Sequence, residues 1–123
     1  MLEPGRSIGR LGFKRWYERQ LIESHAWLVT CFLCAIAVLA ALEVADFQAG
    51  LPALADLTVA FAAGLISWHA LMRYSAILRR AESLARQSTC PRCGRYAAYE
   101  VLRESPPLEV RCRQCESHWR LLQ

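Results

Sequence analysis

The stretch AWLVTCFLCAIAVLAAL, residues 26–42, contains seventeen consecutive residues without a charged side chain. A helix needs about 20 predominantly apolar residues to cross the hydrocarbon core of a bilayer, with about 17 as the lower limit. The run extends to Ala45 if Glu43 lies at the membrane interface. We therefore expect a first transmembrane helix over residues 26–45.

A second apolar run, LTVAFAAGLISWHALM, occupies residues 57–72. It is less apolar than the first run because it contains Gly64, Ser67 and His69. With the residues just before it, the run predicts a second transmembrane helix over residues 51–72. The two segments form a two-helix transmembrane hairpin. The alternative is a buried helical hairpin in a soluble domain, but the rest of the chain is too short and too polar to cover it.

Composition favours the membrane interpretation. The chain has 123 residues, of which 54% are hydrophobic and 21% are charged, which excludes an intrinsically disordered chain. Its length allows one compact domain or two very small units. The apolar residues concentrate between Ala26 and Met72, and every Lys and Arg lies outside that interval. A soluble globular protein of this size would interleave the two kinds of residue.

Basic residues flank both predicted spans. They are Arg6, Arg10, Lys14, Arg15 and Arg19 before the first span, and Arg73, Arg79, Arg80 and Arg86 after the second. The connector contains Glu43, Asp46 and Asp56 and no basic residue. Positive flanks stay on the cytoplasmic side of a membrane. We expect a multi-pass protein of a bacterial-type inner (plasma) membrane, with both termini in the cytoplasm.

The segments that flank the spans have amphipathic patterns. Within residues 1–25, one helical face carries Phe13, Trp16, Tyr17 and Leu21, and the opposite face carries Lys14, Arg15, Glu18 and Arg19. This pattern predicts an interfacial helix that lies in the headgroup layer. After the second span, apolar residues repeat at helical spacing, which predicts a cytoplasmic helical stalk over residues 73–89.

Small residues lie on one face of each predicted span. They are Cys34, Ala37 and Ala41 on the first helix, and Ala60, Gly64 and Ser67 on the second. Such faces allow helix backbones to approach closely within lipid. They could serve the hairpin itself or a helix of a partner protein, and the sequence does not choose between the two.

Four cysteines in residues 90–123 form the strongest motif. Cys90, Cys93, Cys112 and Cys115 have the spacing C-x2-C-x18-C-x2-C, which is close to that of a four-cysteine zinc site. Two tight turns would each present a pair of thiolates to a tetrahedral ion. Gly94 permits the positive φ that such a turn needs. Because 34 residues bury too little surface to fold alone, we expect structural zinc to stabilise this tail.

The tail resembles zinc ribbon modules in its CPRCG opening and its two paired-cysteine turns, from Cys90 to about Leu122. Strand-like segments at residues 96–102 and 108–110 are separated by Pro106 and Pro107, and residues 119–122 can add a third strand. One departure is Glu116, where ribbons often have a second glycine. The resemblance implies a metal site and no particular reaction.

Other interpretations of the tail are disulfides, rubredoxin-like iron and catalytic zinc with His118 as a ligand. A cytoplasmic location disfavours disulfides. The cysteine pairs are closer together than in rubredoxins, and the second pair lacks their Pro and Gly. Four thiolates leave a catalytic zinc no open position. Nucleic acid is not an expected partner, because residues 90–123 carry a formal charge of +2 that a zinc–thiolate centre would cancel.

Weaker signals lie inside or beside the spans. Cys31 and Cys34 have redox spacing, but cysteine in a transmembrane helix is first a small apolar residue. His25 and His69 are expected near the cytoplasmic surface, one on each helix, and could together ligate a haem or a pigment. Alternatively, each is an interfacial histidine beside Trp27 or Trp68.

No catalytic motif is present, because the sequence has no phosphate-binding glycine loop, GxSxG or HExxH. By elimination, the sequence predicts a non-enzymatic accessory, assembly or scaffold subunit of a larger inner-membrane complex, of which a respiratory or photosynthetic complex is one example. Its expected partners are membrane protein subunits and the lipid bilayer, with no small-molecule substrate. The alternatives are electron transfer through iron or haem, and a membrane-tethered adaptor whose ribbon binds a soluble protein.

Overall fold

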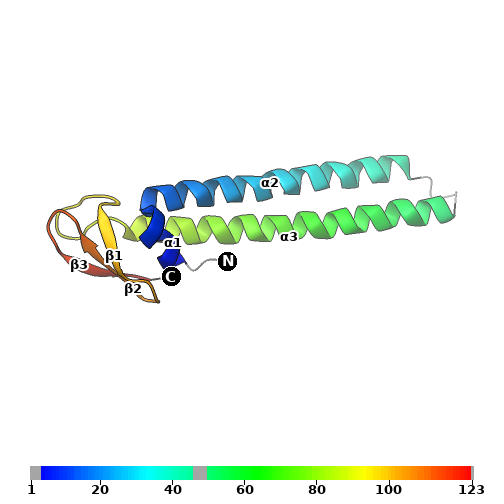
Figure 1. Cartoon of the computed structure of the whole chain (residues 1–123). Helices are drawn as coiled ribbons and strands as arrows, with labels where there is room; N and C mark the ends of the chain where they lie inside the picture. Colours follow the sequence, from blue (N-terminus) through cyan, green and yellow to red (C-terminus); the bar gives the residue numbers. More distant parts are fainter. Residues whose placement is uncertain (1–3, 46–49, 123) are drawn as a thin grey trace. The chain divides into compact units, whose positions relative to one another are not determined.

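The computed structural model describes residues 4–45 and 50–122 (Figure 1). In chain order its elements are α1 (Pro4–Leu11), α2 (Phe13–Val44), α3 (Leu51–Gln87), β1 (Tyr99–Arg103), β2 (Leu108–Cys112) and β3 (His118–Leu121). The chain divides into two compact units. We call Met1–Ile22 with Ile77–Gln123 the ribbon unit, and Glu23–Ala76 the hairpin unit. Helices α2 and α3 each contribute residues to both.

The hairpin unit consists of two packed apolar helical segments. Both parent helices, α2 and α3, are long and apolar enough to cross a membrane. Small side chains of α3 are buried, namely Ala53, Ala60 and Ala70. The larger apolar side chains point outward from both helices, among them Phe32, Leu33, Ile36, Leu39, Phe61 and Leu65. This distribution confirms the predicted helical hairpin.

Hydroxyl groups in the hairpin unit bond to helix carbonyls. Thr30, Thr58 and Ser75 each donate a hydrogen bond to the carbonyl four residues earlier, at 2.7–2.9 Å. Ser67 on α3 instead donates to the carbonyl of Cys31 on α2, at 3.1 Å. The Ser67 hydroxyl also lies 3.3 Å from the Cys31 sulfur. These bonds satisfy polar groups that water would otherwise have to solvate.

The ribbon unit contains a three-stranded antiparallel sheet in the order β1-β2-β3. Pro106 and Pro107 lie in the reversal between β1 and β2, as the sequence predicts. The first strand begins at Tyr99, three residues later than expected. Ala97 has a positive φ of 57°, which interrupts an extended strand. Tyr96 pairs separately with Thr89 in an isolated bridge.

One hydrophobic core joins the sheet to all three helices. Strand β2 alternates strictly, so that Leu108 and Val110 point into this core while Glu109 and Arg111 point away from it. The core residues come from α1, the first turns of α2, the last turns of α3 and every strand. They are Ile8, Phe13, Trp16, Ala81, Leu84, Tyr99, Leu108, Val110 and Leu121.

The surroundings of the N-terminal aromatic residues differ from those expected of an interfacial helix. Phe13 and Trp16 were expected to face lipid headgroups, but they are only 4% and 3% exposed and pack in the ribbon core. The ring centroids of Phe13 and Tyr99 are 5.8 Å apart. The apolar face of the expected stalk is buried too, at Ala81 and Leu84. The sheet has an apolar face of its own to cover, and these amphipathic segments cover it.

Candidate metal centre

The first paired-cysteine turn follows the end of α3. Ser88, the residue after α3, is fully buried and donates a hydrogen bond to the carbonyl of Leu84, at 2.6 Å. Within the turn, the Cys90 N–H donates to the carbonyl of Arg95 at 2.9 Å, and the Gly94 N–H donates to the carbonyl of Cys90 at 3.0 Å. Gly94 has a φ of +73°, which confirms the positive angle that the sequence predicts at this glycine.

The second turn follows β2 and repeats the same backbone bonds. The Cys112 N–H donates to the carbonyl of Ser117 at 2.9 Å, and the Glu116 N–H donates to the carbonyl of Cys112 at 3.1 Å. Glu116 occupies the place of Gly94 and has a φ of +57°. Glu116 in place of glycine therefore leaves the shape of the turn intact. Its backbone has a conformation that favours glycine.

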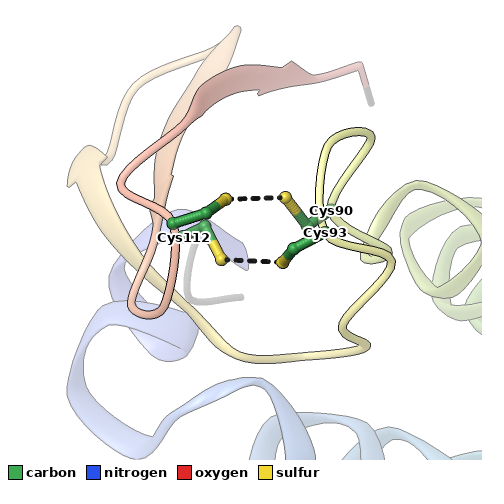
Figure 2. A group of neighbouring side chains, drawn as sticks. Cys90, Cys93 and Cys112 are labelled. Atoms are coloured by element: carbon green, nitrogen blue, oxygen red, sulfur yellow. Dashed lines mark hydrogen bonds between the residues drawn. The ribbon is translucent and has the colours of Figure 1, made fainter.

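The two turns bring the four cysteine sulfurs together. All four Sγ atoms lie within 4.8 Å of one another. Figure 2 shows Cys90 and Cys93 opposite Cys112. The sulfur atoms of Cys90 and Cys115 are 3.5 Å apart, and those of Cys93 and Cys112 are 3.6 Å apart. Thiolates about 2.3 Å from a tetrahedral ion are about 3.8 Å from one another. The cluster therefore has the dimensions of a four-thiolate metal site.

These separations do not fit disulfides, whose sulfur atoms are about 2 Å apart. All six cysteines of the chain are free thiols in the structure. His118 lies at the start of β3 and is exposed, and it is not part of the ligand cluster that the described residues form. The donor set is thus four sulfurs, and a tetrahedral ion bound to all four would have no open position.

Ser117 contacts two of the four sulfurs. Its hydroxyl oxygen lies 3.1 Å from Sγ of Cys90 and 3.0 Å from Sγ of Cys115. Burial raises the pKa of Cys90, but hydrogen bonds from the Cys93 backbone, the Ser117 hydroxyl and the Arg92 backbone lower it to about 6. The pKa of Cys115 is lowered chiefly by hydrogen bonds from the hydroxyl and backbone of Ser117. Sequence reasoning missed Ser117, although its place two residues after Cys115 could have indicated it.

The pKa of Cys93 is shifted in the opposite direction from that of Cys90. A hydrogen bond from the Arg95 backbone lowers its pKa, but burial and the neighbouring sulfurs of Cys90, Cys112 and Cys115 raise it to about 11. Four thiolates within 4.8 Å of one another repel strongly. A bound cation compensates this charge, so metal binding is coupled to the loss of the thiol protons.

The other candidate residues lie in the hairpin unit. His25 and His69 are exposed, and the ring of His69 packs edge-on against Trp27 with centroids 5.9 Å apart. A haem or pigment between the histidines stays a prediction. Of the predicted packing residues, Ala60 is buried, Ala37 is exposed, and the others are half-buried: Cys34, Ala41, Gly64 and Ser67. The interhelical contact of Ser67 is with Cys31, which sequence reasoning did not assign to packing.

The predicted acidic connector is only partly described. Glu43 lies in the last turn of α2, and Asp56 lies inside α3, because that helix begins at Leu51. Asp46 lies outside the described residues.

Comparisons with known protein families, with curated proteins and with solved structures find no match for this chain.

Proposed function

We propose that this chain is a non-catalytic accessory, assembly or scaffold subunit of a larger inner-membrane protein complex, with structural zinc bound in its ribbon unit. The observation that carries the proposal is the outward-facing apolar surface of the hairpin unit. Phe32, Leu33, Leu39 and Phe61 are each more than 60% exposed. A water-soluble protein would leave this surface uncovered, whereas lipid and partner helices would cover it.

The hydrogen bonds of the hairpin support insertion into a membrane. Within the hydrocarbon of a bilayer, a hydroxyl group without a hydrogen-bond partner in the protein costs free energy. The hydroxyls of Thr30, Thr58 and Ser75 bond to their own helices, and that of Ser67 bonds to the other helix. The basic residues on both sides of the apolar runs favour an orientation with the ribbon unit in the cytoplasm.

The four-thiolate centre supports a structural role for the metal. Cys90 and Cys112 are each 1% exposed, and four thiolates suit zinc with a closed coordination sphere. A metal at this centre would tie the chain after α3 to the end of β2. It would thereby hold together the sheet that α1 and α2 pack against. The ribbon unit would then be a rigid surface for contact with other subunits on the cytoplasmic side.

Co-purification tests the accessory role directly. An affinity tag placed after Gln123 would be used to isolate the protein in a mild detergent, and mass spectrometry would identify its partners. We expect a fixed set of membrane subunits at constant stoichiometry. Recovery of the chain alone, in a detergent shown to preserve other membrane complexes, would contradict this role. Recovery with one soluble protein would favour a tethered adaptor instead.

Metal analysis of the same preparation tests the ribbon unit. We expect one equivalent of zinc per chain and no absorption in the visible range. A variant in which Cys93 and Cys115 are both replaced by Ser should lose the zinc, while Cys31→Ser in the hairpin unit should retain it. Stoichiometric iron, or a haem spectrum lost in His69→Ala, would contradict the structural-zinc proposal and favour electron transfer.

A further inference from the structure

The ribbon unit carries nearly all the positive charge of the protein. It contains fourteen of the fifteen Lys and Arg residues and seven of the eleven Asp and Glu residues, so its formal charge is +7. The hairpin unit has a formal charge of −3 by the same count. A zinc–thiolate centre would add −2 and leave the ribbon unit at +5. Charge counted over residues 90–123 alone underestimates this value, because it omits the helical segments that share the core.

Some of these cations are already neutralised within the ribbon unit. Ion pairs join Arg6 to Glu104, Arg86 to Glu82, Arg111 to Glu100, and Arg120 to Glu109. By contrast, Arg19 on α2 and both Arg79 and Arg80 on α3 are exposed. Within residues 4–45 and 50–122, no carboxylate lies within 4.0 Å of these three guanidinium groups.

The three arginines lie on helices that enter the core of the ribbon unit. Trp16 of α2 and Leu84 of α3 pack in the same core. Arg19 follows Trp16 by three residues, and Arg80 precedes Leu84 by four. Since a helix rises about 1.5 Å per residue, each helix places a positive charge about one turn from a residue of that core, and Arg79 adds a third charge.

The same arginines are close in sequence to the apolar runs. Arg19 precedes Ala26 by seven residues within α2, and Arg79 follows Met72 by seven residues within α3. Seven helical residues span about 10 Å, and a long arginine side chain can extend toward the membrane interface. A planar guanidinium group binds phosphate oxygens through two parallel hydrogen bonds.

We propose that Arg19, Arg79 and Arg80 form a binding site for the phosphate groups of anionic phospholipids. This inference rests on the membrane insertion proposed above. Each basic residue at a membrane surface strengthens the attraction to anionic lipid by about five-fold. Three of them together should give a preference for phosphatidylglycerol over phosphatidylcholine of at least about ten-fold.

Native mass spectrometry of the zinc-loaded protein in detergent measures this preference. The protein is mixed with equimolar phosphatidylglycerol and phosphatidylcholine, and the bound lipids are counted. The triple variant Arg19→Gln, Arg79→Gln, Arg80→Gln should bring the ratio of the two lipids close to one. The matched control replaces Arg103, Arg113 and Arg120, which lie in or next to the strands, by Gln and removes the same total charge. The control should keep the wild-type ratio.

Three results would overturn the proposal. The wild type could bind both lipids equally, or both triple variants could lower the ratio by the same factor, which would show that only net charge matters. The third result is an RNA oligonucleotide that binds the wild type and not the first variant, while the lipid ratio stays unchanged. Equal zinc content and equal helical circular dichroism confirm that each variant folds.

Membrane insertion is tested separately. If the protein is absent from carbonate-washed membranes, the proposed function fails together with the lipid site. If the protein is present there and binds both lipids equally, only the lipid site fails.

Discussion

Ser117 influences the charge state of two thiols of the cysteine cluster, because its hydroxyl lowers the pKa of Cys90 and of Cys115. Its hydroxyl contacts the sulfurs of both Cys90 and Cys115, and its backbone closes the second turn. A hydroxyl that donates to a thiolate stabilises the charged form that binds metal. Groups that bond to metal ligands in this way commonly change the affinity for the metal when they are removed.

We expect Ser117→Ala to weaken zinc binding by about 10–100-fold, because the one hydroxyl donor that Cys90 and Cys115 share, and that favours the thiolate, is removed. Competition with a chromogenic chelator measures the affinity. Ser105→Ala is the control, since Ser105 is exposed and its hydroxyl contacts Arg103 rather than a cysteine. Equal affinities for the two variants would show that Ser117 does not support the centre.

Glu116 and Gly94 occupy equivalent places in the two turns, with φ values of +57° and +73°. A residue with a Cβ in this region is strained by about 1–2 kcal/mol, whereas glycine is not. Glu116→Gly should therefore stabilise the ribbon unit by roughly 0.5–1 kcal/mol, after the extra backbone entropy of glycine is subtracted. The midpoint of zinc release in urea should move to higher concentration.

Gly94→Ala provides the opposite test. A Cβ at Gly94 would meet no atom within 4 Å, so the cost would come only from the backbone angle. We expect a loss of about 1 kcal/mol and a lower urea midpoint. If Glu116→Gly and Gly94→Ala shift the midpoint in the same direction, the two turns are not equivalent.

At the scale of elements, the ends of the helices hold the ribbon unit together. Gln87, the last residue of α3, donates to the carbonyl of Leu122 at 2.9 Å and accepts from its N–H at 2.7 Å. The indole N–H of Trp119 donates to the backbone carbonyl of Gln87 at 3.1 Å. Gly12 separates α1 from α2 with a φ of +78°. The hydrogen bonds fix the sheet to α3, and the turn at Gly12 directs α1 back toward the sheet.

Helix α1 supplies a matched pair of glycines for a test of its docking. A Cβ on Gly5 would collide with the carbonyl oxygen of Glu104 and with a methyl group of Leu108. We expect Gly5→Ala to destabilise the ribbon unit by roughly 1–3 kcal/mol, because backbone atoms would have to move. Thermal unfolding, followed by zinc release, measures the effect.

Gly9→Ala on the same helix is the control for this prediction. A Cβ there would meet only the carboxylate end of Glu104, at 3.3 Å, and that side chain can move. Alanine also favours a helix over glycine by up to about 1 kcal/mol. The substitution should therefore be neutral or stabilising. A loss of stability as large as that of Gly5→Ala would contradict the proposed packing of α1.

At the scale of the whole molecule, the two units rely on different interactions. The ribbon unit has a small core whose strands are joined to α3 through the cysteine turns. Metal binding would supply much of the folding free energy of such a small unit. In the hairpin unit, small side chains of α3 are buried and Ser67 donates a hydrogen bond to the carbonyl of Cys31. This unit contains none of the four clustered cysteines.

We therefore expect a strong zinc chelator to unfold the ribbon unit while the hairpin unit stays helical. Hydrogen exchange in detergent should show loss of protection in β1, β2 and β3 after chelation. Amides of residues 26–42 should remain protected, because their bonds lie within one apolar helix. Addition of zinc should restore the protection. Uniform loss across both units would indicate a single cooperative structure.

Much of this arrangement is predictable from local sequence. The two apolar runs predict the helices of the hairpin because a helix satisfies its own backbone groups whatever its neighbours are. The spacing of the cysteine pairs predicts two turns that meet at a metal, and Gly94 predicts one of the positive angles. Glu116 could not be assigned the same angle, because the backbone of the turn imposes it against the preference of the side chain.

The sequence by itself determined the hairpin, the cysteine cluster and the asymmetry of charge, since each depends on residue types at short spacing. Only the tertiary structure decided what the aromatic face of Phe13 and Trp16 contacts. An amphipathic pattern records that one face avoids water, and it is the same whether lipid or a sheet covers that face. In the folded chain α1, α3 and the strands cover that face, and α3 and the strands are far from it in the sequence.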